Sequence, residues 1–251
     1  MKVNFNLIAH RGFSEIAPEN TIPSFDLALD NGFISIEFDV QLTKDKMPVV
    51  IHDDDTFRTT GYKRIIKQAK YSEISEIQAK NNFNLKENVY DIPLLSDLLI
   101  RYKNKSDMHL ELKSNEKELS KIVLGELIKN GYDYENSKLF KKGGITISSF
   151  NLNQLINMRR LNSKIRTAWL VDKLTHNNIK ISNEEGINMI CPKAEFSKED
   201  MVSIARSKNL EIRNWGVKNK EDLVQAYNSG SSGTTVDWPE TAKNIINDIE
   251  N

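Results

Sequence analysis

The stretch that decides the fold spans residues 34–42, ISIEFDVQL. Glu37 and Asp39 alternate with apolar side chains in this run, which is the period of a β-strand. The two carboxylates therefore share one face of the strand, and the isoleucine, phenylalanine and valine between and beside them share the other. In a barrel of parallel strands the apolar face meets the helices, so we expect the carboxylates to face the interior near the carboxyl end of the strand.

Nine apolar, β-branched runs alternate with helical patterns along the chain, as in proteins built from βαβ units. They span residues 5–10, 34–42, 48–52, 108–113, 144–149, 165–170, 187–191, 210–216 and 233–237. Only residues 43–47 separate the second run from the third, whereas a parallel neighbour needs a crossover of about a dozen residues. The third run is therefore a hairpin partner of the second, and eight strands remain. This count predicts a (β/α)8 TIM barrel, and the alternative is an open doubly wound sheet.

The helical patterns are clearest at residues 24–31, 96–103, 117–130, 151–162, 197–209 and 219–229. No glycine-rich turn of the G-x-G-x-x-G or G-x-x-x-x-G-K-[ST] type is present, which disfavours a nucleotide-binding version of the fold. Residues 54–92 do not follow the alternation. We expect them to form a small insertion at one end of the barrel, with a short helical patch over Tyr71–Lys80, within a single domain spanning residues 1–251.

Composition excludes several classes of protein. The chain of 251 residues carries 35 basic and 35 acidic side chains, which argues against a dominant nucleic-acid or membrane-surface footprint, although a global sum can hide opposed local patches. Its one cysteine, Cys191, excludes an intramolecular disulfide and a cysteine zinc cage, and its apolar setting predicts burial. No stretch approaches the roughly 18 apolar residues of a membrane span, so we expect a cytoplasmic protein without stable membrane insertion. Nothing in the composition indicates an oligomeric state.

A second run repeats the pattern of alternating charges. His109, Glu111 and Lys113 share one face of the strand at 108–113. Three carboxylates converging on one barrel mouth call for a cation, because a buried unpaired carboxylate is costly. Oxygen ligands favour Mg²⁺ or Ca²⁺ over zinc. The alternative is that each carboxylate pairs with a nearby base, such as Lys113 or Arg11.

Two histidines end apolar runs at the same predicted end of the barrel. His10 closes the first run and His52 the third, and imidazole is suited to proton transfer near neutral pH. A lone histidine at a strand end is more often a hydrogen-bonded structural residue. Arg11 follows His10 and can present a bidentate fork to phosphate. His176 lies in a polar stretch and is expected to be solvated. For His109, both a structural and a catalytic role are left open. Together these groups suit phosphoryl transfer.

Several short motifs resemble the glycerophosphodiester phosphodiesterase family in both order and spacing. They are Ala9-His10-Arg11-Gly12, Pro18-Glu19-Asn20-Thr21, Glu37-Phe38-Asp39-Val40 and Val49-Val50-Ile51-His52-Asp53. Further landmarks are Arg58-Thr59-Thr60-Gly61, Ile92-Pro93-Leu94-Leu95, Leu110-Glu111-Leu112-Lys113, Ser148-Ser149-Phe150, Trp215 and Val236-Asp237-Trp238-Pro239. The resemblance covers essentially the whole chain.

The resemblance implies a (β/α)8 barrel that cleaves glycerophosphodiesters to sn-glycerol 3-phosphate and an alcohol, with a divalent cation, Mg²⁺ or Ca²⁺. It implies metal ligands at Glu37, Asp39 and Glu111, an acid/base pair at His10 and His52, phosphate contacts at Arg11 and Lys113, and further site residues at Glu19, Asn20 and Trp215. We expect His10 to act as the base toward the glycerol 2-hydroxyl or water, and His52 to protonate the leaving alkoxide.

The chain departs from the family pattern at Phe57, at residues 216–218 and at Val236. No departure removes an expected ligand or proton carrier, but each affects which alcohol fits. One alternative is phospholipase D-like cleavage of lysophospholipids, which needs an apolar groove at the mouth. Candidates for that groove are Phe57, Tyr62, Tyr71 and Phe83, which could equally form a small core of the insertion. A further alternative is an inactive barrel kept for binding.

The neutral total hides opposed local charges. Residues 37–55 hold six acidic and two basic side chains, and residues 56–90 hold seven basic and three acidic ones. Solvated surface lysines explain most of the second group. A sharper hypothesis is that the basic insertion overhangs the barrel mouth and draws an anionic diester toward the cation.

Overall fold

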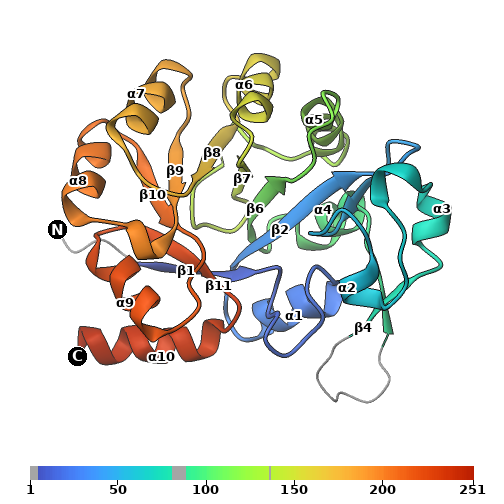
Figure 1. Ribbon diagram of the computed structural model, residues 1–251, viewed down its shortest axis with the longest axis horizontal. Helices are drawn as coiled ribbons and strands as arrows, with labels where there is room; N and C mark the ends of the chain where they lie inside the picture. Colours follow the sequence, from blue (N-terminus) through green and yellow to red (C-terminus); the bar gives the residue numbers. More distant parts are fainter. Residues whose placement is uncertain (1–4, 81–88, 136) are drawn as a thin grey trace.

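The computed structural model describes residues 5–80, 89–135 and 137–251, and its centre is a closed barrel of eight parallel strands (Figure 1). The strands are β1 (Asn6–His10), β2 (Ser35–Leu42), β6 (Asp107–Leu112), β7 (Ile145–Ser149), β8 (Arg166–Val171), β9 (Met189–Pro192), β10 (Glu211–Asn214) and β11 (Gly233–Val236). Each pairs with the next, and β11 pairs with β1 to close the barrel. The sheet is therefore the expected (β/α)8 barrel and not an open doubly wound sheet.

A helix follows each barrel strand and covers its outer face. These helices are α1 (Ile22–Asp30), α4 (Leu95–Tyr102), α5 (Leu119–Lys129), α6 (Leu152–Leu161), α7 (His176–Glu184), α8 (Glu199–Ser207), α9 (Lys220–Asn228) and α10 (Pro239–Glu250). The polar sequence of α7 and the C-terminal α10 were not among the clear helical patterns. Among the described residues, no helix combines the length and the apolar character that a bilayer crossing demands.

The apolar side of β2 packs outward, as its alternation predicts. Phe38 meets Phe25 of α1 edge to face, with ring centroids 5.9 Å apart, and Phe25 meets Tyr102 of α4 at the same distance. Phe25 and Phe38 are fully buried. Because this face is occupied by helix side chains, the opposite face of β2 with Glu37 and Asp39 must point into the barrel.

The strand β3 (Pro48–Val50) pairs antiparallel with β2, so the hairpin expected from the short connection is confirmed. The insertion beyond it contains α2 (Phe57–Thr60), the 3₁₀ turn η1 (Ile66–Gln68), α3 (Tyr71–Ile74), β4 (Gln78–Lys80) and β5 (Val89–Asp91). The helical patch expected over Tyr71–Lys80 is wrong beyond Ile74, because β4 pairs antiparallel with β5. That pairing depends on a strand further along the chain, which a local pattern does not reveal.

The loop after β1 has an unusual backbone that fixes its side chains. Arg11 and Asn20 adopt positive φ angles of 55° and 57°, and Gly12 one of 86°. A Cβ atom at Gly12 would lie 2.3 Å from the Ser24 hydroxyl, so only glycine fits there. The Arg11 carbonyl accepts hydrogen bonds from the Asn20 amide and the Ser24 hydroxyl, both at 3.0 Å. Such left-handed residues persist where surrounding contacts hold them.

Candidate active site

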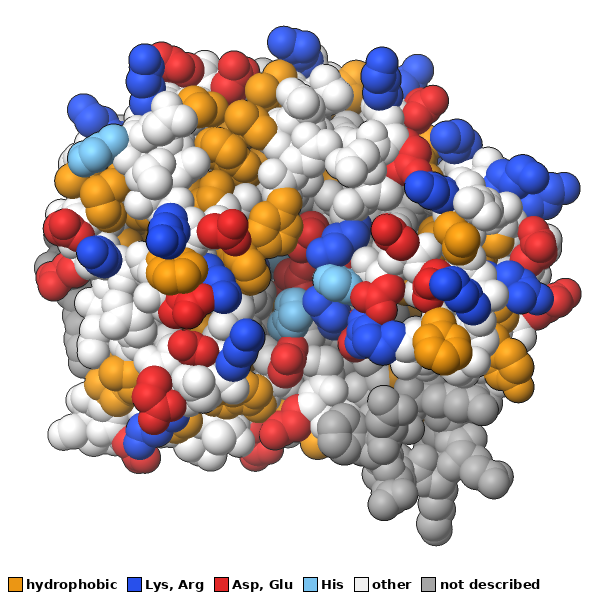
Figure 2. Space-filling model, in the orientation of Figure 1, with side chains coloured by type: hydrophobic (Ala, Val, Ile, Leu, Met, Phe, Trp, Pro, Cys, Tyr) orange, Lys and Arg blue, Asp and Glu red, His pale blue; other side chains and the backbone are white. Residues whose placement is uncertain are grey.

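A cavity of about 260 Å³ opens at the carboxyl ends of the barrel strands. Its walls include His10, His52, Lys113 and Trp215, together with carboxylates of β2 and β6. Figure 2 shows this hollow on the visible face, with histidine, acidic and basic side chains gathered around it. The cavity lies where barrel enzymes hold their reacting groups.

Three buried carboxylates meet at this cavity: Glu37 and Glu111 line its wall, and Asp39 lies beside them. Asp39 and Glu111 are register partners on the neighbouring strands β2 and β6, and Glu37 lies one pleat before Asp39. One oxygen of each lies within 4.8 Å of the others. All three side chains are buried. The strand alternation thus correctly predicted which acidic residues converge.

Basic groups pair with the same carboxylates, as the alternative to a cation site predicted. Arg11 Nε lies 3.2 Å from Asp39 Oδ2, and the Arg11 backbone amide donates to Glu37 Oε2 at 3.3 Å. Lys113 Nζ lies 3.1 Å from Glu111 Oε1 and 3.7 Å from Asp39 Oδ1. The centre therefore carries both signs of charge, as a site for an anionic substrate and a cation requires.

The carboxylates titrate unequally. Burial and the charge of Asp39 raise the pKa of Glu111 to about 7, and the same two causes raise the pKa of Glu37. Burial opposes ionisation of Asp39 too, but Arg11 and Lys113 outweigh it and lower the pKa of Asp39. Within the described residues, the buried Asp39 Oδ1 has no hydrogen-bond partner. Three crowded buried carboxylates, one of whose oxygens accepts no hydrogen bond, fit a hard divalent cation such as Mg²⁺ or Ca²⁺.

An aspartate supports His10 from the far end of the chain. His10 Nδ1 donates to Asp237 Oδ1 at 2.6 Å, and His10 Nε2 points to the centre, 3.8 Å from Glu37 Oε2. Burial lowers the pKa of His10, but the bond to Asp237 and the charge of Glu37 outweigh burial and raise it. Asp237 was noted in the sequence only as part of a family motif. It is the last residue of the run at 233–237, and this place at the end of a barrel strand could have predicted that Asp237 lies in the site.

His52 has a similar support of its own. Its Nδ1 donates to Asp53 Oδ1 at 2.6 Å. Burial lowers the pKa of His52, and the positive charge of Arg11 lowers it further. Asp39 and Asp53 raise this pKa, but the net shift is downward. Arg58 then links Asp53 to Glu19, with contacts of 2.6 Å to each.

The remaining expected site residues, Asn20, Glu19 and Trp215, each form a hydrogen bond to a neighbouring group. Asn20 Nδ2 donates to Asp39 Oδ2 at 2.9 Å, which orients that carboxylate. Glu19 accepts from Arg11 Nη1 at 2.9 Å. Trp215 donates through Nε1 to a backbone carbonyl of β8 at 3.0 Å and lies edge-on to Phe150, with centroids 5.0 Å apart.

Arg213 is a cavity residue that the sequence analysis missed. It is 1% exposed, lines the floor of the cavity and lies beside the buried Cys191 thiol. Its Nε and Nη1 atoms have no hydrogen-bond partner among the residues that the structure describes. The inward alternation that identified Glu37 also applies to the 210–216 run and could have identified Arg213.

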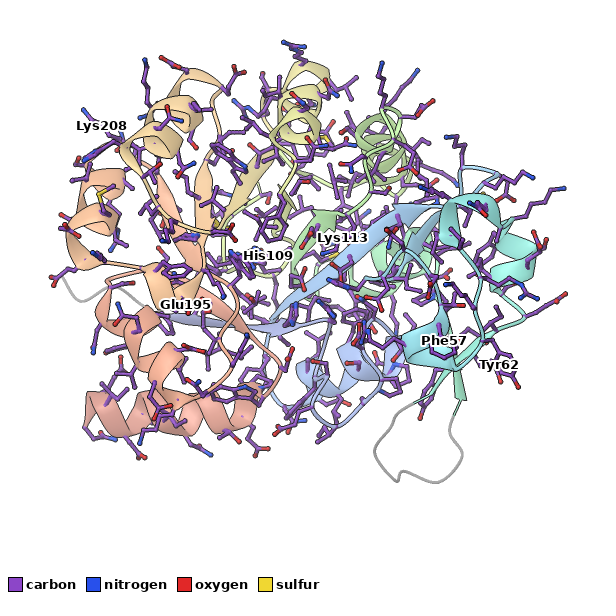
Figure 3. The ribbon with its side chains drawn as sticks, in the orientation of Figure 1. Phe57, Tyr62, His109, Lys113, Glu195 and Lys208 are labelled. Atoms are coloured by element: carbon purple, nitrogen blue, oxygen red, sulfur yellow. The ribbon has the colours of Figure 1, made fainter. Side chains whose placement is uncertain are left out.

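The other two histidines lie outside the site. His109 is fully buried below Glu111, and its Nε2 lies 2.9 Å from Asp107 Oδ2 (Figure 3). His109 also stacks on Phe140, with ring centroids 5.9 Å apart. His176 is exposed at the start of α7, as expected.

Fold and site together define a barrel enzyme of the phosphoric diester hydrolase class. The model of the Glycerophosphoryl diester phosphodiesterase family matches residues 10–241, and the chain belongs to this family. A glycerophosphodiester phosphodiesterase of Bacillus altitudinis is 28% identical over 97% of this chain and 99% of that protein. A phosphodiesterase of Oleispira antarctica, solved in complex with the product sn-glycerol-3-phosphate, superposes with a TM-score of 0.82 at 22% identity, covering 96% of each chain. A glycerophosphodiester phosphodiesterase of Parabacteroides distasonis superposes with a TM-score of 0.82 at 24% identity, covering 100% of both chains.

Proposed function

We propose that this protein hydrolyses glycerophosphodiesters to sn-glycerol 3-phosphate and an alcohol, with a divalent cation and histidine acid/base catalysis. The observation that carries the proposal is that two aspartate-supported histidines, His10 and His52, line the same cavity as Glu37 and Glu111. Family membership and the product complex of the Oleispira antarctica protein support the substrate class.

Glu37, Asp39 and Glu111 would hold the cation, which when bound neutralises charge on the phosphodiester. Arg11 and Lys113 flank the carboxylates and offer N–H donors to the phosphate oxygens. Both side chains are already held by ion pairs, so little side-chain freedom is lost when substrate binds.

The two histidines would exchange protons with substrate through Nε2, because each already donates from Nδ1 to an aspartate. The directions of their pKa values support an order opposite to the one expected from the sequence. A lowered pKa favours the neutral form of His52, which suits a base, and a raised pKa favours the protonated form of His10, which suits an acid. His52 would then activate the nucleophile, and His10 would protonate the leaving alkoxide. Attack by water gives sn-glycerol 3-phosphate directly, whereas attack by the glycerol 2-hydroxyl gives a cyclic phosphodiester that water opens to the same product in a second step.

The test of activity is release of sn-glycerol 3-phosphate from a panel of glycerophosphodiesters, with and without chelator. We expect release only when a divalent cation is present. His10→Ala and His52→Ala should each lower kcat at least about 100-fold without changing the fold, as read by circular dichroism. Activity that survives chelation would refute the role of the cation, and near-full activity of either variant would refute that histidine's role. A lysophospholipid in the panel separates this activity from phospholipase D-like cleavage.

A substrate with a p-nitrophenolate leaving group tests the order of the histidines. This leaving group departs without protonation, so loss of the acid matters less than loss of the base. We expect His10→Ala to recover much of its activity on this substrate relative to an alkyl diester, and His52→Ala to recover none. The reverse result would restore the order expected from the sequence.

A further inference from the structure

Two aromatic side chains of the insertion, next to the cavity, are exposed to solvent. Phe57 is 59% exposed and Tyr62 is 64% exposed. The core of the insertion is instead built from Val49, Ile51, Ile66, Ala69, Ile74 and Ile92, with Tyr71 packed against it. Phe57 and Tyr62 therefore form neither the insertion core nor a groove in the cavity wall, and Phe83 lies outside the described residues. The unexplained feature is a pair of exposed aromatics.

The turn that carries this pair is held rigidly. The Thr60 hydroxyl donates to the Thr56 carbonyl at 2.7 Å and accepts from the Tyr62 amide at 3.0 Å. The Thr56 hydroxyl accepts from the Arg64 amide at 3.0 Å and donates to the Tyr62 carbonyl. Gly61 supplies the left-handed residue of the turn, with φ of 79°. The aromatics are thus displayed from a fixed backbone, which lowers the entropy lost when they are buried by a partner.

The segment that carries the aromatic pair, residues 56–80, holds six basic and two acidic side chains, and it follows the three aspartates at 53–55. Lys63, Arg64, Lys67 and Lys70 are all exposed. Lys63 Nζ lies 3.6 Å from Asp55 Oδ2. Among the described residues, the side chains of the other three form no ion pair within 4.0 Å, although Lys70 lies near enough to Asp45 to lower the pKa of that carboxyl. Figure 2 shows basic side chains beside hydrophobic ones on this part of the face, with acidic side chains between them. Aromatic side chains within a basic patch suit a lipid surface with anionic headgroups, where the rings enter the interface and the cations meet the phosphates.

The same turn lies at the rim of the cavity. Arg58, between the two aromatics in sequence, forms ion pairs with Glu19 and Asp53, and Asp53 holds His52 of the cavity wall. Figure 3 shows Phe57 and Tyr62 together on the insertion, to the lower right of Lys113, which lines the cavity. We infer that the turn bearing Phe57 and Tyr62 docks on an anionic lipid surface and sets the cavity mouth beside it.

Vesicle co-sedimentation of the full chain tests this inference without depending on turnover. We expect the protein to sediment with phosphatidylcholine vesicles that contain phosphatidylglycerol, more weakly with phosphatidylcholine alone, and less in higher salt. The double variant Phe57→Ser with Tyr62→Ser should lower the vesicle partition coefficient at least about tenfold. Its turnover of a water-soluble glycerophosphodiester should stay within about twofold of wild type, because neither side chain lines the cavity.

The matched control removes two equally exposed apolar side chains elsewhere. Ile100 on α4 is 69% exposed and Ile128 on α5 is 58% exposed. Changing both to serine should leave vesicle binding unchanged. The inference would be overturned if the protein did not sediment with anionic vesicles, or if the aromatic double variant bound them as well as wild type. Either result is also expected if this surface binds a protein partner instead of a lipid surface. Neither result would bear on the proposed hydrolysis, which is measured on soluble substrate.

Discussion

Replacing Glu111 by glutamine should stabilise the metal-free protein at alkaline pH. Burial and the charge of Asp39 raise the pKa of Glu111 from 4.5 to about 7, in spite of Lys113 at 3.1 Å. A group whose pKa is raised by folding contributes stability that is present below its unfolded value and is lost as pH rises through its folded value. Ionised Glu111 therefore costs about 3 kcal/mol of folding free energy at pH 8.

The glutamine variant keeps the shape of the side chain without the charge. In chelator at pH 8, its melting temperature should exceed that of wild type by about 6 °C for a chain of this length. The difference should shrink toward pH 5, where Glu111 in the wild type is protonated. With Mg²⁺ or Ca²⁺ the effect should reverse, because bound cation stabilises the folded state and the variant lacks one carboxylate ligand.

Thermal unfolding followed by circular dichroism, from pH 5 to pH 8, measures both effects. Glu76→Gln is the control, because Glu76 is exposed on the insertion and should show neither. The reasoning fails if the glutamine variant at position 111 is less stable than wild type in chelator at pH 8. It fails equally if the variant gains as much stability from the cation as wild type does.

Three further changes test other contacts. Asp237→Asn replaces the carboxylate that raises the pKa of His10 by a neutral amide. The limb of the pH–rate profile due to His10 should therefore move to lower pH and kcat should fall about tenfold; an unmoved limb would contradict this support. Asn20→Ala removes a buried donor to the Asp39 carboxylate and should cost about 1–3 kcal/mol in denaturant unfolding. If Asp39 is one of the cation ligands, as proposed, calorimetry should also show weaker cation binding. Lys63→Glu combined with Arg64→Glu should lower kcat/KM for an anionic diester most at low salt, and an identical salt dependence in variant and wild type would exclude steering.

The sequence predicted the barrel well because its signals are local. The alternation in 34–42 identified the inward face of β2, and the short connection before 48–52 identified the hairpin. Where a strand depends on a distant partner, the local pattern failed, as with β4 inside the expected helical patch. The polar helix α7 was missed because few apolar positions mark its buried side.

In the candidate site too, residues were predicted correctly where the signal is local and missed or misassigned where it depends on distant contacts. The convergence of Glu37, Asp39 and Glu111 follows from two strand periods and from the rule that parallel strands end at one mouth. Arg213 obeys the same period and was identified only by its place on the cavity floor. The sequence-based order of the two histidines had no support in spacing, because proton affinity depends on burial and on charges that surround each ring.

By itself the sequence determined the class of fold, the family motifs and the residues that can carry charge into the barrel. Only the tertiary structure decided that Asp237 supports His10 across the closure of β1 with β11, and that Arg58 ties Glu19 to Asp53 beside His52. It also decided that Phe57 is exposed to solvent, whereas the apolar side chains that form the core of the insertion are buried. The physical reason is that side-chain direction along one strand is set by local backbone geometry, whereas contacts between distant segments and burial are set by how the whole chain closes and packs.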